Sequence, residues 1–218
     1  MSGREPDVVG GANPTLSTMT RCGRVVASYV LVAFGISLLV RADVGVAPFD
    51  VLTTGLADSL GIRLGYAFLI TSVVFYGTGV LLGGRTGWAS LVGTIVIAPL
   101  LEMALAIVPE PDRLASRIPM FAIGVLVLVA GVCLVITTEL GPGPGEVFML
   151  GLIVRGMAVA PARWITDGVA FAAGLALGGA IGAGTVVFAF AFGPLVALGL
   201  RRLDYTPPTF VADAVVAP

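Results

Sequence analysis

Six long apolar runs constrain this chain more than any other feature of its sequence. Each approaches the roughly 17–25 residues that a helix needs to cross the hydrocarbon core of a bilayer. With 57% hydrophobic and 11% charged residues among 218, little is left for a soluble domain. We therefore expect an all-α polytopic membrane protein. The runs cover residues 25–40, 65–82, 88–108, 118–137, 164–181 and 184–200.

A match of Gly, Pro and carboxylate residues recurs at a spacing of 96 residues, which drops to 95 further along the chain. Such a match is hard to obtain from hydrophobic composition alone. At the first spacing Gly45, Pro48, Asp50, Val51, Gly55 and Leu56 pair with Gly141, Pro144, Glu146, Val147, Gly151 and Leu152. At the second, Gly79, Leu82, Gly83, Gly84, Gly87, Pro99 and Leu100 pair with Gly174, Leu177, Gly178, Gly179, Gly182, Pro194 and Leu195.

The match predicts two tandem homologous halves, each with three long membrane helices and one short helix that starts with proline. The first half covers residues 21–112 and the second half covers 113–202. We expect a disordered cytoplasmic tail over 1–20 and a second tail over 203–218. Both lie outside the matched region.

The two short helices are expected over 46–61 and 142–158. Pro48 and Pro144 suit the first helical position, where the missing N–H costs nothing. Asp50 and Glu146 then fall in the first turn, facing the positive end of each helix. Irregular backbone at membrane depth must be buried in protein or line a wet cavity, and transporters often place their site at such paired interruptions.

Arginine positions allow two topologies. If the short helices dip in and return, six crossings leave Arg41, Arg63, Arg113 and Arg117 outside, eight arginines against four, and the halves are inverted. If they cross, there are eight crossings and parallel halves, with ten arginines inside against two. The charge count favours parallel halves. Both alternatives place the two termini in the cytoplasm.

Several function classes are excluded by what the sequence lacks. All 12 basic residues are Arg and no basic stripe exists, which argues against a nucleic-acid partner. Without His, and with Cys22 and Cys133 in unrelated places, we expect no metal site and no disulfide. No nucleophile constellation or phosphate-binding loop is present. We therefore expect neither an enzyme nor a cofactor.

Residues 41–52, 141–146 and 182–194 together resemble the YczE/YyaS/YitT family of bacterial integral membrane proteins. The resemblance covers about 25–202 and implies a multi-pass protein of the inner membrane, without implying a substrate. The family usually has Trp where Phe49 stands, and Arg-Asp where Gly145 and Glu146 stand. The missing arginine leaves Glu146 without that partner.

Asp50 and Glu146 are the first candidates for a site, because carboxylates at the starts of two half-buried helices can bind a cation or exchange a proton. The alternative is that each carboxylate only stabilises its helix turn, by roughly 0.3–1 kcal/mol. Pro48 and Pro144 would frame such a site.

Four further residues flank these turns. Asp43 and Glu139 obey the same 96-residue spacing and could form a second ring of acceptors at a cavity mouth, although solvated loop charges are the commoner role. Thr53 and Thr54 could offer hydroxyls to a solute, or bond back to their own helix.

Ionisable groups inside the long runs are costly and therefore suggest function. Glu102 is the best placed by depth. Asp167 can pair with Arg163 four residues earlier, and Arg155 can counter Glu146 or extend to the interface.

Two functions remain open from the sequence. The preferred one is a permease-like protein with a site for a small polar or cationic solute between its halves, embedded in the lipid bilayer. The alternative is a non-transporting membrane protein that stabilises or regulates a partner through small-residue helix faces. A homodimer is compatible with either.

Overall fold

The computed structural model describes residues 17–203, and this part of the chain forms eight helices without a strand. The tail predicted over 1–20 is wrong at its end, because Ser17 caps a helix that starts at Thr18. The rest of both predicted tails, 1–16 and 204–218, lies outside the described residues. The helices are α1 Thr18–Ala42, α2 Pro48–Leu60, α3 Leu64–Leu81, α4 Trp88–Ile107, α5 Leu114–Ile136, α6 Pro144–Val154, α7 Val159–Ala176 and α8 Ala183–Arg202.

Five of these helices, α1, α3, α4, α5 and α8, are long and apolar enough to cross a membrane. This confirms the expected all-α polytopic membrane protein. The sixth expected crossing, at 164–181, corresponds to α7, which is as long as α3 but is not among the five. It starts and ends five residues earlier than expected, and so takes in both Arg163 and Asp167.

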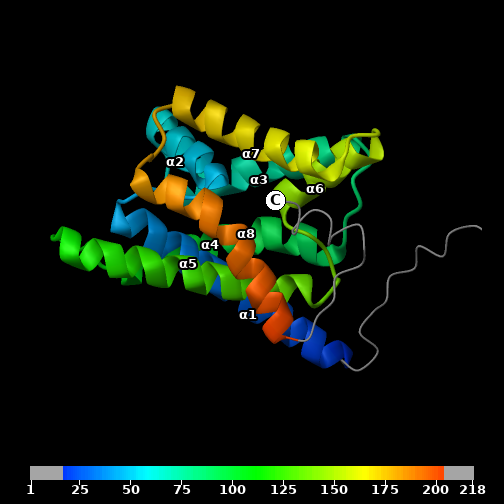
Figure 1. Ribbon diagram of the computed structural model, residues 1–218, viewed down its shortest axis with the longest axis horizontal. Coiled ribbons are helices and arrows are strands. Elements are labelled where there is room, and N and C mark those ends of the chain that lie inside the picture. The colour runs from blue at the N-terminus through cyan, green and yellow to red at the C-terminus, as the bar shows by residue number, and fades with distance from the viewer. Residues whose placement is uncertain (1–16, 204–218) are drawn as a thin grey trace, which may run out of the picture.

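Helices α1 and α5 pack along each other in opposite directions (Figure 1). Near the start of α1, Arg24 donates to the Thr137 hydroxyl at the end of α5, 3.2 Å away. Further along α1, Gly35 lies so close to α5 that a Cβ built on it would be 2.8 Å from the Leu128 Cβ. Small residues permit this approach of two backbones. The 96-residue match pairs α1 with α5, so the preference for parallel halves is wrong.

The loop before α2 enters the bundle from the end of the molecule where α1 ends, and α2 then runs back to that same end. Asp43 before it and Asp58 near its end line the same cleft. Helix α6 does the same at the opposite end, where Thr137 lies beside the start of α1 and Arg155 donates to the carbonyl of Leu82 at the end of α3. With 13 and 11 residues the two helices rise about 20 Å or less, short of a hydrocarbon core of about 30 Å. Their length explains why the eight-crossing count fails.

The short helices are docked by equivalent contacts, α2 on α7 and α6 on α3. A Cβ on Gly79 of α3 would lie 2.6 Å from the backbone nitrogen of Phe148 in α6. Likewise, a Cβ on Gly174 of α7 would overlap the backbone of Leu52 in α2. Helices α2, α3, α6 and α7 thus form one group, which lies beside the group of α1, α4, α5 and α8 (Figure 1).

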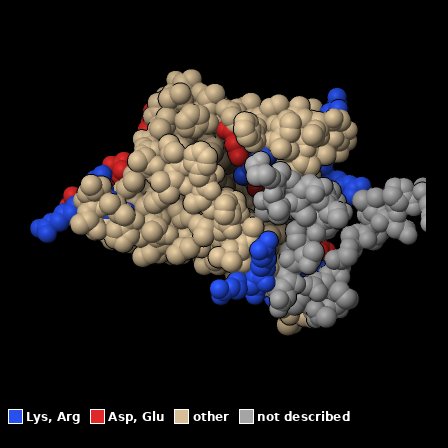
Figure 2. All heavy atoms as spheres, viewed as in Figure 1, with Lys and Arg blue, Asp and Glu red and all other residues tan. Residues whose placement is uncertain are grey.

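The outer surface suits a lipid environment. On the face in Figure 2, a broad uncharged surface separates the acidic and basic side chains at the left end from a mixed acidic and basic group near the centre and from basic side chains farther right. Many large apolar side chains are exposed in the described residues, among them Trp164, Phe190, Ile107 and Met103. In a bilayer these side chains would face acyl chains rather than water.

Candidate functional site

The first turn of α2 holds a carboxylate inside the bundle. Pro48 occupies the start of the helix, as expected, and Ala47 before it provides no side-chain cap. Asp50 follows in the first turn and is only 4% exposed. Within residues 17–203 no hydrogen bond or ion pair reaches its carboxylate. The positive end of the α2 dipole is therefore its main electrostatic support.

The first turn of α6 places Glu146 in a different environment. Its side chain is 43% exposed and lies 3.5 Å from the guanidinium of Arg163 in α7, whose Nε donates to Asp167 at 2.8 Å. The pair of Arg163 and Asp167 was expected. The arginine that the family carries is missing at position 145, and Arg163 of α7 pairs with Glu146 instead. Arg155 does not, since it bonds to the α3 end instead.

The starts of α2 and α6 meet through aromatic side chains. The Phe49 ring lies 4.0 Å from where a Cβ on Gly145 would be. The ring of Phe49 also contacts Phe75 at a centroid distance of 5.3 Å, and Phe75 contacts Phe148 at 5.3 Å. The first turns that carry Asp50 and Glu146 are therefore neighbours, bordered by apolar rings.

The two threonines of α2 bond back to their own helix, as the sequence suggested. Thr53 donates to the Phe49 carbonyl at 3.1 Å and Thr54 to the Asp50 carbonyl at 2.9 Å. Thr54 has a second contact that the sequence did not indicate: its oxygen accepts the N–H of Ala180 at 2.9 Å. Thr54 therefore ties α2 to the loop between α7 and α8.

A cleft of about 370 Å³ opens beside α2, at the end of the molecule where α1 ends. Arg41, Asp43 and the exposed Asp58 line it near the surface, and the buried Thr54 and the partly buried Ala180 line its depth. Because Thr54 is one turn from Asp50 and bonded to its carbonyl, the cleft leads toward the first turn of α2. A second cleft of about 290 Å³ adjoins it, sharing Arg41.

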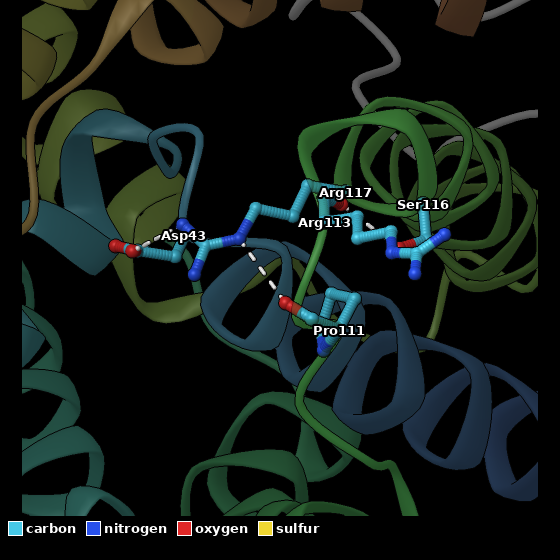
Figure 3. A network of polar contacts seen from close by, with 5 residues as sticks. All are labelled: Asp43, Pro111, Arg113, Ser116 and Arg117. Atoms are coloured by element: carbon cyan, nitrogen blue, oxygen red, sulfur yellow. Dashed lines mark hydrogen bonds and ion pairs between the residues drawn. The ribbon is translucent and has the colours of Figure 1, made fainter.

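Ion pairs hold the rim of these clefts. Arg117, at the start of α5, donates to the Asp43 carboxylate at 2.8 Å and to the carbonyl of Pro111 at 3.2 Å (Figure 3). Arg41 pairs with Glu110 and donates to the carbonyl of Leu105 at 2.7 Å. The rim thus fastens the ends of α1, α4 and α5 to one another.

Asp43 and Glu139 do not form one ring of acceptors, so that expectation is wrong. Both residues follow the end of a long helix with a left-handed backbone, at φ 50 and 55. However, Asp43 lies at the end of α1 and Glu139 just beyond the end of the antiparallel α5. The two carboxylates are consequently at opposite ends of the molecule.

Glu102 is not the lone ionisable group that its depth in the apolar run suggested. It pairs with Arg63 at 2.7 Å and accepts the backbone N–H of Gly65 at 2.6 Å. That N–H belongs to the first turn of α3, which has no other side-chain cap. Glu102 therefore fixes the start of α3 against α4, on the wall of the smaller cleft.

Two hydroxyls of α3 were missed by sequence reasoning. Thr71 and Ser72 are 3% and 0% exposed, and neither side-chain oxygen has a hydrogen-bond partner among the described residues. Unpaired buried hydroxyls are rare in native proteins. The 95-residue spacing could have drawn attention to this part of α3. It pairs Ser72 with Asp167 and Phe68 with Arg163, which are charged residues.

Comparisons with known proteins agree with a membrane protein. The chain is 30% identical over 181 residues to an uncharacterized protein of Haemophilus influenzae, covering 81% of this chain and 83% of the relative. It is 25% identical over 183 residues to the uncharacterized membrane protein YczE of Bacillus subtilis, with the same coverage. This confirms the resemblance to YczE-type proteins. No solved structure matches. A family model matches residues 19–201, and the chain belongs to that family, described as a family of unknown function (DUF6198).

Proposed function

We propose that this protein is a small permease-like membrane protein that moves a polar or cationic solute past Asp50. One observation supports the proposal most: the carboxylate of Asp50 is buried without a partner among the described residues, at the start of a helix that enters and returns, below a cleft that reaches the surface. Ionisable residues inside a membrane bundle are costly, and they commonly mark solute or ion pathways. The proposed function includes no catalysed reaction and requires no cofactor.

The arrangement of the two halves supports this function. If residues 21–112 and 113–202 descend from one ancestral unit, the antiparallel packing of α1 and α5 makes them inverted repeats. The reciprocal docking of α2 on α7 and of α6 on α3 fits the same relation. Inverted repeats allow two conformations of similar energy, one open to each side, because each half can adopt the shape of the other.

The orientation follows from the positive-inside rule. Arg41, Arg63, Arg113 and Arg117 lie at the cleft end, and the other seven arginines of the described residues lie toward the opposite end. The end richer in arginine faces the cytoplasm. On this basis the cleft opens to the outside of a bacterial inner membrane, and both termini are cytoplasmic.

The proposal is tested by transport. A thermal-shift screen of polar metabolites and cations on the purified protein identifies a solute, because a ligand selective for the folded state raises the unfolding temperature. Liposomes containing the protein should then take up that solute, and the double variant Asp50→Asn with Glu146→Gln should not. Uptake by the double variant at the wild-type rate would remove both carboxylates from the mechanism. A stable complex with a second membrane protein, and no uptake, would favour the non-transporting alternative.

A further inference from the structure

The two short helices differ in how the charge of their first turn is neutralised. In the second half, α7 supplies Arg163 to Glu146, and Asp167 completes an ion-paired triad. The 95-residue spacing places Phe68 and Ser72 of α3 at the positions that correspond to Arg163 and Asp167. The first half therefore has a carboxylate at Asp50, but no protein cation where the second half has one.

The buried face of α3 borders the first turn of α2. Phe49, which directly precedes Asp50, contacts the rings of Phe68 and Phe75 at centroid distances of 5.9 and 5.3 Å. Thr71 and Ser72 lie between these two rings along α3. The two hydroxyls without partners thus lie on the part of α3 that packs against the start of α2.

Three buried oxygen-bearing side chains without partners in one region are costly. An isolated carboxylate moved out of water loses far more solvation than a helix dipole returns, and each unpaired hydroxyl adds a penalty. Carboxylate and hydroxyl oxygens are also the donors that hard cations prefer. A cation bound there would satisfy all three groups at once.

We propose that the Asp50 carboxylate and the hydroxyls of Thr71 and Ser72 form a site for a small monovalent cation such as Na⁺, in the position that the Arg163 guanidinium takes in the second half. The second half then carries a fixed internal cation and the first half an exchangeable one. This inference names the coupling ion of the proposed transport. The role of the cation in transport rests on the proposed function.

The cleft provides a route for this cation. Asp43 and Asp58 near the surface lower the potential at its entrance, although Arg41 and the Arg117 partner of Asp43 offset part of that effect. Thr54 at its depth is bonded to the carbonyl of Asp50. The cleft therefore reaches to within about one helical turn of Asp50.

Binding is measured first, without transport. The unfolding temperature of the full chain in mild detergent is followed while NaCl replaces choline chloride at constant ionic strength and pH. The wild type should show a saturable rise. Asp50→Asn should show none, and should start from an unfolding temperature at least as high as that of the wild type in choline chloride, because its buried charge is gone. Asp112→Asn, the same change on an exposed loop residue, should keep the rise.

The hydroxyls distinguish a ligand role from a structural one. Thr71→Val with Ser72→Ala should raise the half-saturating Na⁺ concentration about thirtyfold, the loss expected when two ligand contacts worth about 1 kcal/mol each disappear. A purely structural role would leave that concentration unchanged. Such a result would overturn the site, as would a rise in Asp50→Asn equal to that in the wild type. A wild-type response to pH but not to Na⁺ would also overturn it, because the carboxylate would then only exchange protons.

Failure of this site and failure of the proposed function are distinguishable. Saturable Na⁺ binding without solute uptake would remove transport and leave the site standing. Solute uptake that is the same in Na⁺ and in choline would remove the site and leave transport standing.

Discussion

The starts of α2 and α6 occupy corresponding positions in the two halves, yet they differ in burial and in charge. Asp50 is nearly inaccessible and has no partner among the described residues, whereas Glu146 is almost half exposed and pairs with Arg163. The backbone contacts that dock the two helices are nevertheless the same. On the proposed duplication, the two halves have kept the packing of these helices and have changed the chemistry of their first turns.

The largest effect is expected where the halves are alike. Gly79→Ala and Gly174→Ala each place a Cβ against the backbone of a docked short helix. Each should lower the free energy of unfolding by about 1–3 kcal/mol, because neither neighbour is a flexible side chain. Denaturant titration in detergent measures this loss. The matched controls Gly77→Ala and Gly168→Ala meet nothing within 4 Å and should change little. A large loss in only one of the two docking variants would contradict equivalent packing.

The next effect belongs to the second half alone. Arg163→Gln leaves two half-exposed carboxylates without their guanidinium, and should lower the free energy of unfolding by about 1–2 kcal/mol, between the values for surface and buried pairs. Arg155→Gln removes one hydrogen bond to the Leu82 carbonyl and serves as the control, with a smaller loss. Equal losses in both variants would mean that the triad does not support α6.

A similar but smaller loss is expected at Thr54, whose counterpart in the second half is Leu150. Thr54→Val removes the acceptor of the Ala180 N–H and should cost about 1 kcal/mol. Thr53→Val removes only a bond within α2 and should be nearly neutral. Thermal unfolding of both variants checks the difference. If Thr53→Val proved the more harmful, the tie to the α7–α8 loop would be unimportant.

The smallest effect has the opposite sign. Thr71 and Thr166 correspond at the 95-residue spacing and are both buried, but only Thr166 donates a hydrogen bond, to the carbonyl of Ala162 at 2.8 Å. In choline chloride, Thr71→Val should therefore raise the unfolding temperature slightly, by removing an unpaired hydroxyl. Thr166→Val should lower it or leave it unchanged. A fall in both would show that Thr71 has a partner in the absence of Na⁺.

Much of the fold could be predicted from periodicity and local chemistry. Apolar length predicted the long helices, and proline at the first helical position placed the starts of α2 and α6 at Pro48 and Pro144. The relative direction of the halves could not be predicted in the same way. That direction depends on whether α2 crosses the membrane, and the arginine count is compatible with both answers. The contact between α1 and α5 decides it.

The candidate site was predicted only in part. Asp50 and Glu146 were identified by their spacing, but their partners depend on which helices pack together. Local sequence predicts neither Arg163 beside Glu146 nor the lack of a basic side chain beside Asp50 in the described residues. Glu102 illustrates the same limit. Its depth in an apolar run suggested an isolated charge. In the structure the tertiary fold brings the start of α3 beside Glu102, which caps that helix and pairs with Arg63.

The direction of the halves is the central claim, and labelling of single cysteines tests it most directly. In a background of Cys22→Ser and Cys133→Ala, the variants Arg63→Cys, Arg85→Cys and Arg113→Cys are treated in intact cells with a thiol reagent that does not cross membranes. The inverted arrangement predicts that positions 63 and 113 are labelled from outside and that position 85 is labelled only after permeabilisation. Labelling of position 85 in intact cells, with 63 and 113 protected, would contradict it and restore the parallel arrangement.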